Sequence, residues 1–234
     1  MPVEHQADAQ AGREGGGLPG VDPPQLQPAG AAGLVDQVLM PGIFAQTVAF
    51  GAITTGIGLS EDLARGLVDR FRTLPMARSA VLAGRTVADL VRNVGVVALM
   101  VAMGYLVGFR VQTSPLALLA GILLLLLFGF ALSWVFALVG LSVANAESAQ
   151  AASFPLLFPL VFASSAFVPT ATMPAPLRAF ADHQPVTAVI DAVRALVLGG
   201  PTATLVLTSL AWSLGILAVA APLAVRRYRR ASGG

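Results

Sequence analysis

The sequence predicts an all-α fold, a polytopic bundle of transmembrane helices, and three observations support this. Of the 234 residues, 56% are hydrophobic and only 11% are charged, whereas a soluble domain carries about 25% charged residues. Mean hydropathy is +0.79. The apolar residues gather in blocks of about 20, which as helices would cross a hydrocarbon core of about 30 Å. We expect about five spans, a cytoplasmic amphipathic helix and a short amphipathic helix in the outer leaflet.

The segment 1–33 differs from the rest of the chain. It is rich in Gly and Pro and contains no apolar run, so it cannot bury enough surface to offset the entropy of ordering, and we expect a disordered tail. It also has neither the basic start nor the apolar core of a secretory signal peptide. The transmembrane domain is therefore predicted over 34–230, followed by a short tail over 231–234.

Apolar blocks mark the spans, predicted at 38–59, 87–107, 116–141, 154–168 and 205–225. The first contains many small residues three or four apart, which let helices approach closely, either within the chain's own bundle or at a dimer interface. The fourth is short and carries Pro155 and Pro159, which remove backbone donors and favour a kink.

Arginine distribution predicts the orientation. Five Arg lie between the first two spans and four follow the last span. Because cytoplasmic loops are enriched in basic residues, both segments are predicted to be cytoplasmic, with four crossings between them. The N-terminus is then external. The chain is expected to be a multi-pass protein of the bacterial plasma membrane.

The segment 60–85 is predicted to start with an amphipathic helix. Ser60 is a candidate N-cap, acidic residues follow it in the first turn, and apolar residues recur every three or four positions. Asp62 with Arg65, and Asp69 with Arg72, are spaced as ion pairs on its polar flank. The pattern favours a helix lying in the membrane interface, and it also suits a docking helix for a cytosolic protein.

Other polar residues receive structural interpretations. Asp89 and Arg92, three apart at the start of the second span, are predicted to form a structural ion pair. Residues from Val186 onward form the short amphipathic helix, which Gly199 would end. Asp182 and His183 suggest a catalytic pair with a nearby serine, but adjacent residues cannot orient each other as a triad requires. We therefore favour a capping or interfacial role for His183.

Composition excludes several function classes. The chain has 14 basic residues, all Arg, together with two His and no Cys. Without Lys it has no Walker A phosphate loop, and without Cys it has no thiolate nucleophile or cysteine metal site. The Arg lie beside apolar spans, so they indicate topology and not a nucleic-acid partner. No cofactor and no metal is expected to bind this chain.

The stretch LMPGIFAQTVAFGAITTGIGLSEDLARGLVDRFRTLPMARSAVLAGRTVADLVRN, residues 39–93, together with HQPVTAVIDAVRALVLG, residues 183–199, resembles the membrane subunits of type-2 ABC exporters, in particular the daunorubicin-resistance-type permeases of actinobacteria. The resemblance implies a partner subunit that binds ATP and Mg²⁺, and a second permease copy in a homodimer. It implies export of hydrophobic antibiotics, lipids or polysaccharides. It also implies a coupling helix that docks on the ATPase, mapping here onto Glu61, Asp62, Arg65, Gly66, Asp69, Arg70 and Arg72.

The front of the chain departs from this family, whose members usually have six spans and a cytoplasmic N-terminus. Here residues 1–33 stand where the first span is expected. The leading expectation is an exporter permease that moves an amphipathic drug outward. The alternative is a truncated, non-transporting membrane subunit with an assembly or regulatory role.

Overall fold

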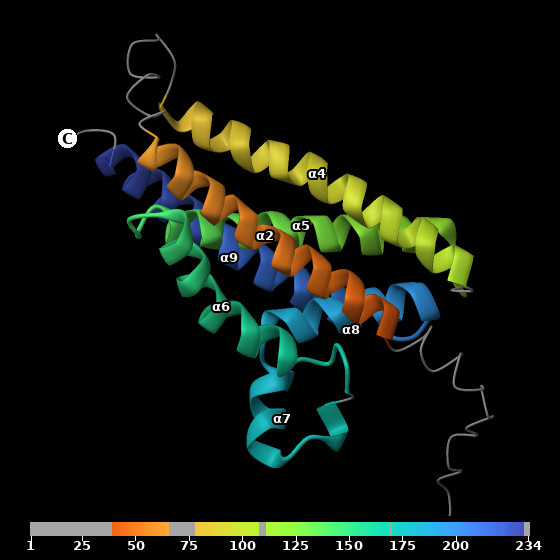
Figure 1. Ribbon diagram of the computed structural model, residues 1–234. Helices are drawn as coiled ribbons and strands as arrows, with labels where there is room; N and C mark the ends of the chain where they lie inside the picture. The colour runs from red at the N-terminus through yellow and green to blue at the C-terminus, as the bar shows by residue number, and fades with distance from the viewer. Residues whose placement is uncertain (1–38, 66–77, 108–110, 169, 232–234) are drawn as a thin grey trace, which may run out of the picture.

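The computed structural model describes residues 39–65, 78–107, 111–168 and 170–231, and within these ranges the secondary structure is helical (Figure 1). The expected tail 1–33 lies outside the described residues. The elements are α2 (Met40–Ala64), α4 (Arg78–Val107), α5 (Pro115–Gly140), α6 (Ala146–Phe162), the 3-10 turn η2 (Thr170–Thr172), α7 (Ala175–Asp182), α8 (Pro185–Leu198) and α9 (Thr202–Ala231). The predicted all-α membrane bundle is confirmed.

Four of the described helices are long and apolar enough to cross a membrane: α2, the part of α4 over Gly84–Leu106, α5, and α9. The fourth predicted span corresponds to α6, which has 17 residues and is about 26 Å long. It begins at Ala146 and ends at Phe162, so the prediction of a helix over 154–168 was wrong at both ends. Its helix continues through Pro155 and Pro159.

The connections show that α6 still carries a crossing. Leu59 of α2, Leu141 after α5 and Tyr228 of α9 pack in one cluster, so these three helices finish at the same end of the bundle. The start of α5 lies at the opposite end of the bundle (Figure 1). Just before it, the backbone N–H of Gln112 donates to the carbonyl of Val197 at the end of α8. Ala166, just after α6, lies against Gly42 at the start of α2, which is the end of the bundle opposite to the start of α6, so α6 returns the chain across.

This arrangement places Arg65, the C-cap of α2, and the Arg-rich last turn of α9 at one end of the bundle. The last turn of α9 carries Arg229 and Arg230, and the packed pair Leu59 and Tyr228 brings that turn beside the end of α2. Figure 1 shows the start of α4 at the same end. A single Arg-rich end is the geometry that the predicted orientation requires.

The core is built around α2 and α5, which share the most extensive helix contact. Gly56 and Gly140 meet there: a methyl group added at either would overlap a backbone carbonyl oxygen of the other helix. Ala45, Ala49 and Ala52 of the same small-residue run have no exposed surface. Of the two interpretations of this run, the structure supports packing within the chain's own bundle.

One helix boundary corrects the sequence analysis. Ser60 does not cap a separate helix, because α2 continues through it to Ala64. Its hydroxyl donates instead to the carbonyl of Ile57 at 2.7 Å. In contrast, α8 ends where the sequence predicts, with Gly199 as C-cap at φ 94°, a conformation that only glycine adopts readily.

Candidate functional site

The end of α2 and the start of α4 flank the predicted coupling segment. Asp62 of α2 forms an ion pair with Arg85 of α4. The Arg85 guanidinium lies directly over Gly58, in the space that a Cβ at that position would occupy. Arg65 pairs with Glu61 at 3.3 Å. The predicted Asp62–Arg65 pairing is therefore wrong: each of the two residues has a different partner.

The remaining residues of the predicted coupling helix are Gly66, Asp69, Arg70 and Arg72. They lie outside the described residues, so their docking role stays a prediction. The described residues on either side of them, the end of α2 and the start of α4, form the frame of this segment. Both ends of the 66–77 segment enter helices that are tied to each other by the Asp62–Arg85 ion pair.

A polar cluster continues this tie along α2 and α4, centred on Asp89. Its carboxylate accepts a hydrogen bond from the Thr55 hydroxyl at 2.5 Å and forms an ion pair with Arg92 at 3.2 Å. The Arg92 guanidinium also donates to the carbonyl of Gly51 at 3.1 Å and to the hydroxyl of Thr54 at 2.5 Å. Sequence spacing predicts the Asp89–Arg92 pair, and the structure places the two side chains in contact. Their bonds to α2 were not predicted.

Asn93 extends the cluster toward α5. The residue is 2% exposed, and its amide nitrogen has no hydrogen-bond partner among the described residues. Gly51 of α2 and Gly129 of α5 leave the space that its amide occupies. A buried amide nitrogen without a partner is energetically unfavourable, so Asn93 is a polar point within the apolar junction of α2, α4 and α5.

A second polar cluster lies at the opposite end, where the turn after α6 meets α8. Asp191 accepts a hydrogen bond from the Ser165 hydroxyl at 2.7 Å and pairs with Arg194 at 3.0 Å, while Arg194 also donates to the carbonyl of Ser165 at 3.0 Å. Burial lowers the pKa of Arg194, and the Asp191 charge opposes that shift. Gln184 donates to the carbonyl of Ala163 at 2.5 Å. The cluster fastens α8 to the end of α6.

The arrangement around His183 does not form a catalytic site. Its Nδ1 lies 2.9 Å from the carbonyl oxygen of Ala179, and Asp182 pairs with Arg178 at 3.5 Å. The nearby Ser165 is engaged with Asp191. These contacts give His183 the capping role favoured from the sequence, and no nucleophile–base pair arises among these residues.

Two apolar features were not identified from the sequence. The first is an exposed aromatic row on α6, in which Phe158 stacks on Phe162 with ring centroids 4.1 Å apart and Phe162 stacks on Phe167 at 5.7 Å. Their spacing of four and five residues was the available signal. In the sequence these phenylalanines lie among many other apolar residues, so their exposure on one face could not be predicted.

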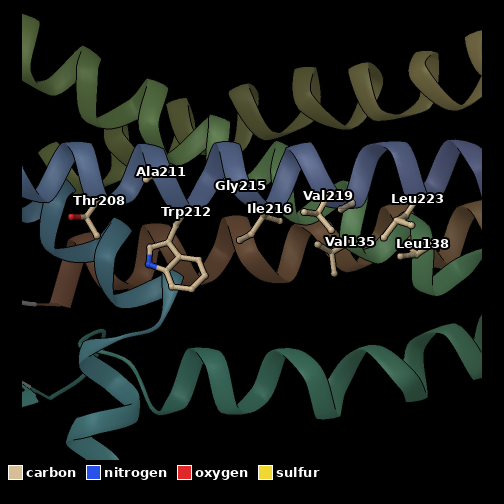
Figure 2. Close-up of a pocket in the computed structure, with 10 residues that line it drawn as sticks. Val135, Leu138, Thr208, Ala211, Trp212, Gly215, Ile216, Val219 and Leu223 are labelled. Carbon is tan, nitrogen blue, oxygen red and sulfur yellow. The ribbon is translucent and has the colours of Figure 1, made fainter.

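The second feature is a groove of about 820 Å³ between α5 and α9, which we call the α5–α9 groove. Trp212, Ile216, Val219 and Leu223 of α9 line it together with Val135 and Leu138 of α5 (Figure 2). Thr208 closes one end of the row. The three- and four-residue spacing along α9 was visible in the sequence, but the facing wall on α5 was not.

A helical bundle that crosses the membrane several times, with arginines at one end, defines a multi-pass membrane protein. The comparisons agree: the ABC-2 type transporter family matches residues 22–198, and the chain belongs to this family. The resemblance seen in the sequence is confirmed, and the protein is an integral, multi-pass membrane protein.

Named relatives are drug-resistance permeases. The chain is similar to the daunorubicin resistance ABC transporter permease protein DrrB1 of Streptomyces coeruleorubidus, with 38% identity over 193 residues that cover 82% of this chain and 68% of that protein. It is also similar to the probable doxorubicin resistance ABC transporter permease protein DrrC of Mycobacterium tuberculosis, with 31% identity over 191 residues covering 79% and 68%. No solved structure matches the chain.

Proposed function

We propose that this chain is the membrane-spanning subunit of an ATP-driven exporter that moves a hydrophobic or amphipathic drug outward across the plasma membrane. Membership of the ABC-2 family carries this proposal, and the daunorubicin and doxorubicin resistance named for its relatives favours a drug over a lipid or polysaccharide. ATP and Mg²⁺ are bound by a separate subunit. A second copy of the permease completes the pathway.

The partner ATPase docks on the coupling segment, which includes Glu61, Asp62, Arg65, Gly66, Asp69, Arg70 and Arg72. The frame around that segment supports this role. Because the Asp62–Arg85 pair and the Asp89 cluster tie α2 to α4, a displacement of the intervening residues moves both helices together. A tied pair of helices transmits such a movement to the rest of the bundle, since packed elements respond as units.

The aromatic row on α6 supports the drug assignment. Phe158 is 51% exposed and Phe162 is 47% exposed. Planar polycyclic compounds stack favourably on such rings. A groove or row of aromatic side chains recognises shape and apolar area, with few polar groups to fix orientation.

The test is drug-stimulated ATP hydrolysis by the chain co-expressed with the ATP-binding subunit. Reversing Asp69 or Arg72 should reduce co-purification of the ATPase and its stimulation by drug. The matched control is Arg178→Glu, which breaks an exposed ion pair with Asp182 in α7 at the other end of the bundle and should leave assembly unchanged. If the Asp69 and Arg72 reversals leave assembly and coupled hydrolysis intact, the docking assignment is wrong.

A further inference from the structure

The α5–α9 groove leads directly to a row of cations. Leu223 lines its last turn, and Arg226 and Arg227 follow three and four positions later, with Arg230 one further turn along. Residues three, four and seven apart share a helix face. The face of α9 that forms the apolar groove therefore carries basic side chains at its end, and Arg226, Arg227 and Arg230 are all exposed.

We propose that this groove binds one anionic phospholipid, with an acyl chain along α5 and α9 and the phosphate headgroup at Arg226 and Arg230. The occupant is argued from two independent features: an apolar channel and an adjacent cluster of positive charge. A lipid is the molecule in a membrane whose chemistry combines an apolar chain with an anionic end. A juxtamembrane cluster of Arg attracts anionic headgroups electrostatically.

The dimensions agree with this occupant. Trp212 lies 14 residues before Arg226, about 21 Å along the helix axis at 1.5 Å per residue. Half of the hydrocarbon core is about 15 Å, and the headgroup region lies beyond it. A chain whose headgroup sits at Arg226 therefore ends near Trp212. The groove volume of about 820 Å³ falls within the range of about 300–1,000 Å³ typical of sites for small organic ligands.

Trp212 gives a direct reporter of the acyl chain. The chain has two tryptophans: Trp134 is 8% exposed in the core, whereas Trp212 is 41% exposed in the groove. Trp134→Phe leaves Trp212 as the single fluorophore. The purified full chain is reconstituted into vesicles of 90% phosphatidylcholine and 10% phosphatidylglycerol, with bromine placed on the distal acyl carbons of either the phosphatidylglycerol or an equal amount of phosphatidylcholine.

A selective site predicts that brominated phosphatidylglycerol quenches Trp212 more strongly than brominated phosphatidylcholine does, by roughly threefold or more. Electrostatic attraction by two cations near the surface is sufficient for a ratio of this size. The double substitution Arg226→Gln and Arg230→Gln should bring the ratio close to one. Arg178→Gln, an exposed Arg on α7, is the matched charge control and should leave the ratio unchanged. A ratio near one in the parent chain overturns the proposal, as does a high ratio that survives the double substitution.

Two further variants separate the groove from the general lipid annulus. Moving the reporter to the opposite face of α9, by Trp212→Phe with Leu214→Trp, should abolish the selectivity, because Leu214 does not line the groove. Gly215 lines the groove and has nothing within 4 Å of an added Cβ, so Gly215→Leu places a side chain in the groove and should reduce quenching of Trp212. Its control is Gly95→Leu, a second glycine with open space on α4. Equal selectivity at both reporter positions would show annular enrichment only and would overturn a groove site.

Discussion

The contact between Gly56 and Gly140 gives the sharpest test of the fold. In Gly56→Ala the added methyl overlaps the Phe136 carbonyl oxygen and lies 2.9 Å from the carbonyl carbon, so the backbone of α5 must move. Overpacking of this kind costs about 1–3 kcal/mol, while replacing a helix-interior glycine by alanine returns about 1 kcal/mol. The net expectation is a destabilisation of up to about 2 kcal/mol, with about 1 kcal/mol at the middle of the range. Gly95→Ala is the matched control, because nothing lies within 4 Å of its added methyl and only the helix-propensity gain applies.

Thermal unfolding in detergent measures the difference, followed by the fluorescence of Trp134 in a Trp212→Phe background that leaves it as the single tryptophan. Trp134 lies on α5, packed edge-to-face with Phe130 at 6.1 Å, so its emission reports the loss of this core. A difference of about 2 kcal/mol between the two variants corresponds to about 4–8 °C in melting temperature. Gly140→Ala combined with Gly56→Ala should destabilise less than the sum of the single changes, since both widen the same contact. A Gly56→Ala protein that melts at or above Gly95→Ala would refute the close approach.

The other predictions concern the polar clusters and one cap. Asp89→Ala should lower the melting temperature more than Asp89→Asn. Both changes remove the charge that pairs with Arg92, but the Asn side-chain oxygen still accepts from the Thr55 hydroxyl, whereas alanine leaves no acceptor there; equal losses would argue against a hydrogen-bonded tie. Asp191→Ala should increase protease access to the turn after α6, since Arg194 loses its ion-pair partner, and unchanged digestion would contradict a fastened α8. Gly199→Ala should destabilise the chain by about 1–3 kcal/mol because φ there is positive. Circular-dichroism melts that match the parent would contradict a positive φ at this residue.

Helix positions were largely predictable because apolar block length is a local property. The spans predicted at 116–141 and 205–225 fall within or close to α5 and α9. In two helices the apolar block starts later than the helix: α4 begins at Arg78 and not at 87, and α6 begins at Ala146 and not at 154. The larger misplacement of a whole element is that of α6. Its first turns are small and polar residues that Asn145 caps by accepting from the backbone N–H of Ser148 at 2.8 Å, and the serines after Phe162 form a turn against α8. Hydropathy registers neither signal.

The contacts around the predicted docking site could be predicted from the sequence only in part, because charge spacing is also a local property. Charge spacing on a helix suggests partners three or four residues apart, and it identified the Asp89–Arg92 contact. It failed for Asp62, whose partner Arg85 lies 23 positions away. That pair depends on how α2 and α4 approach each other, which spacing along one helix does not contain.

The sequence by itself determined the fold class, the membrane location and the family, because these follow from composition, from the length of apolar blocks and from recognisable stretches of residues. Only the tertiary structure decided which side chains meet. The buried Asp89 cluster, the fastening of α8 by Asp191 and the α5–α9 groove each join residues from separate helices. Their contacts depend on how helices approach one another, and in an apolar bundle that approach is set by small residues at a few crossings, which a pattern along one helix does not contain.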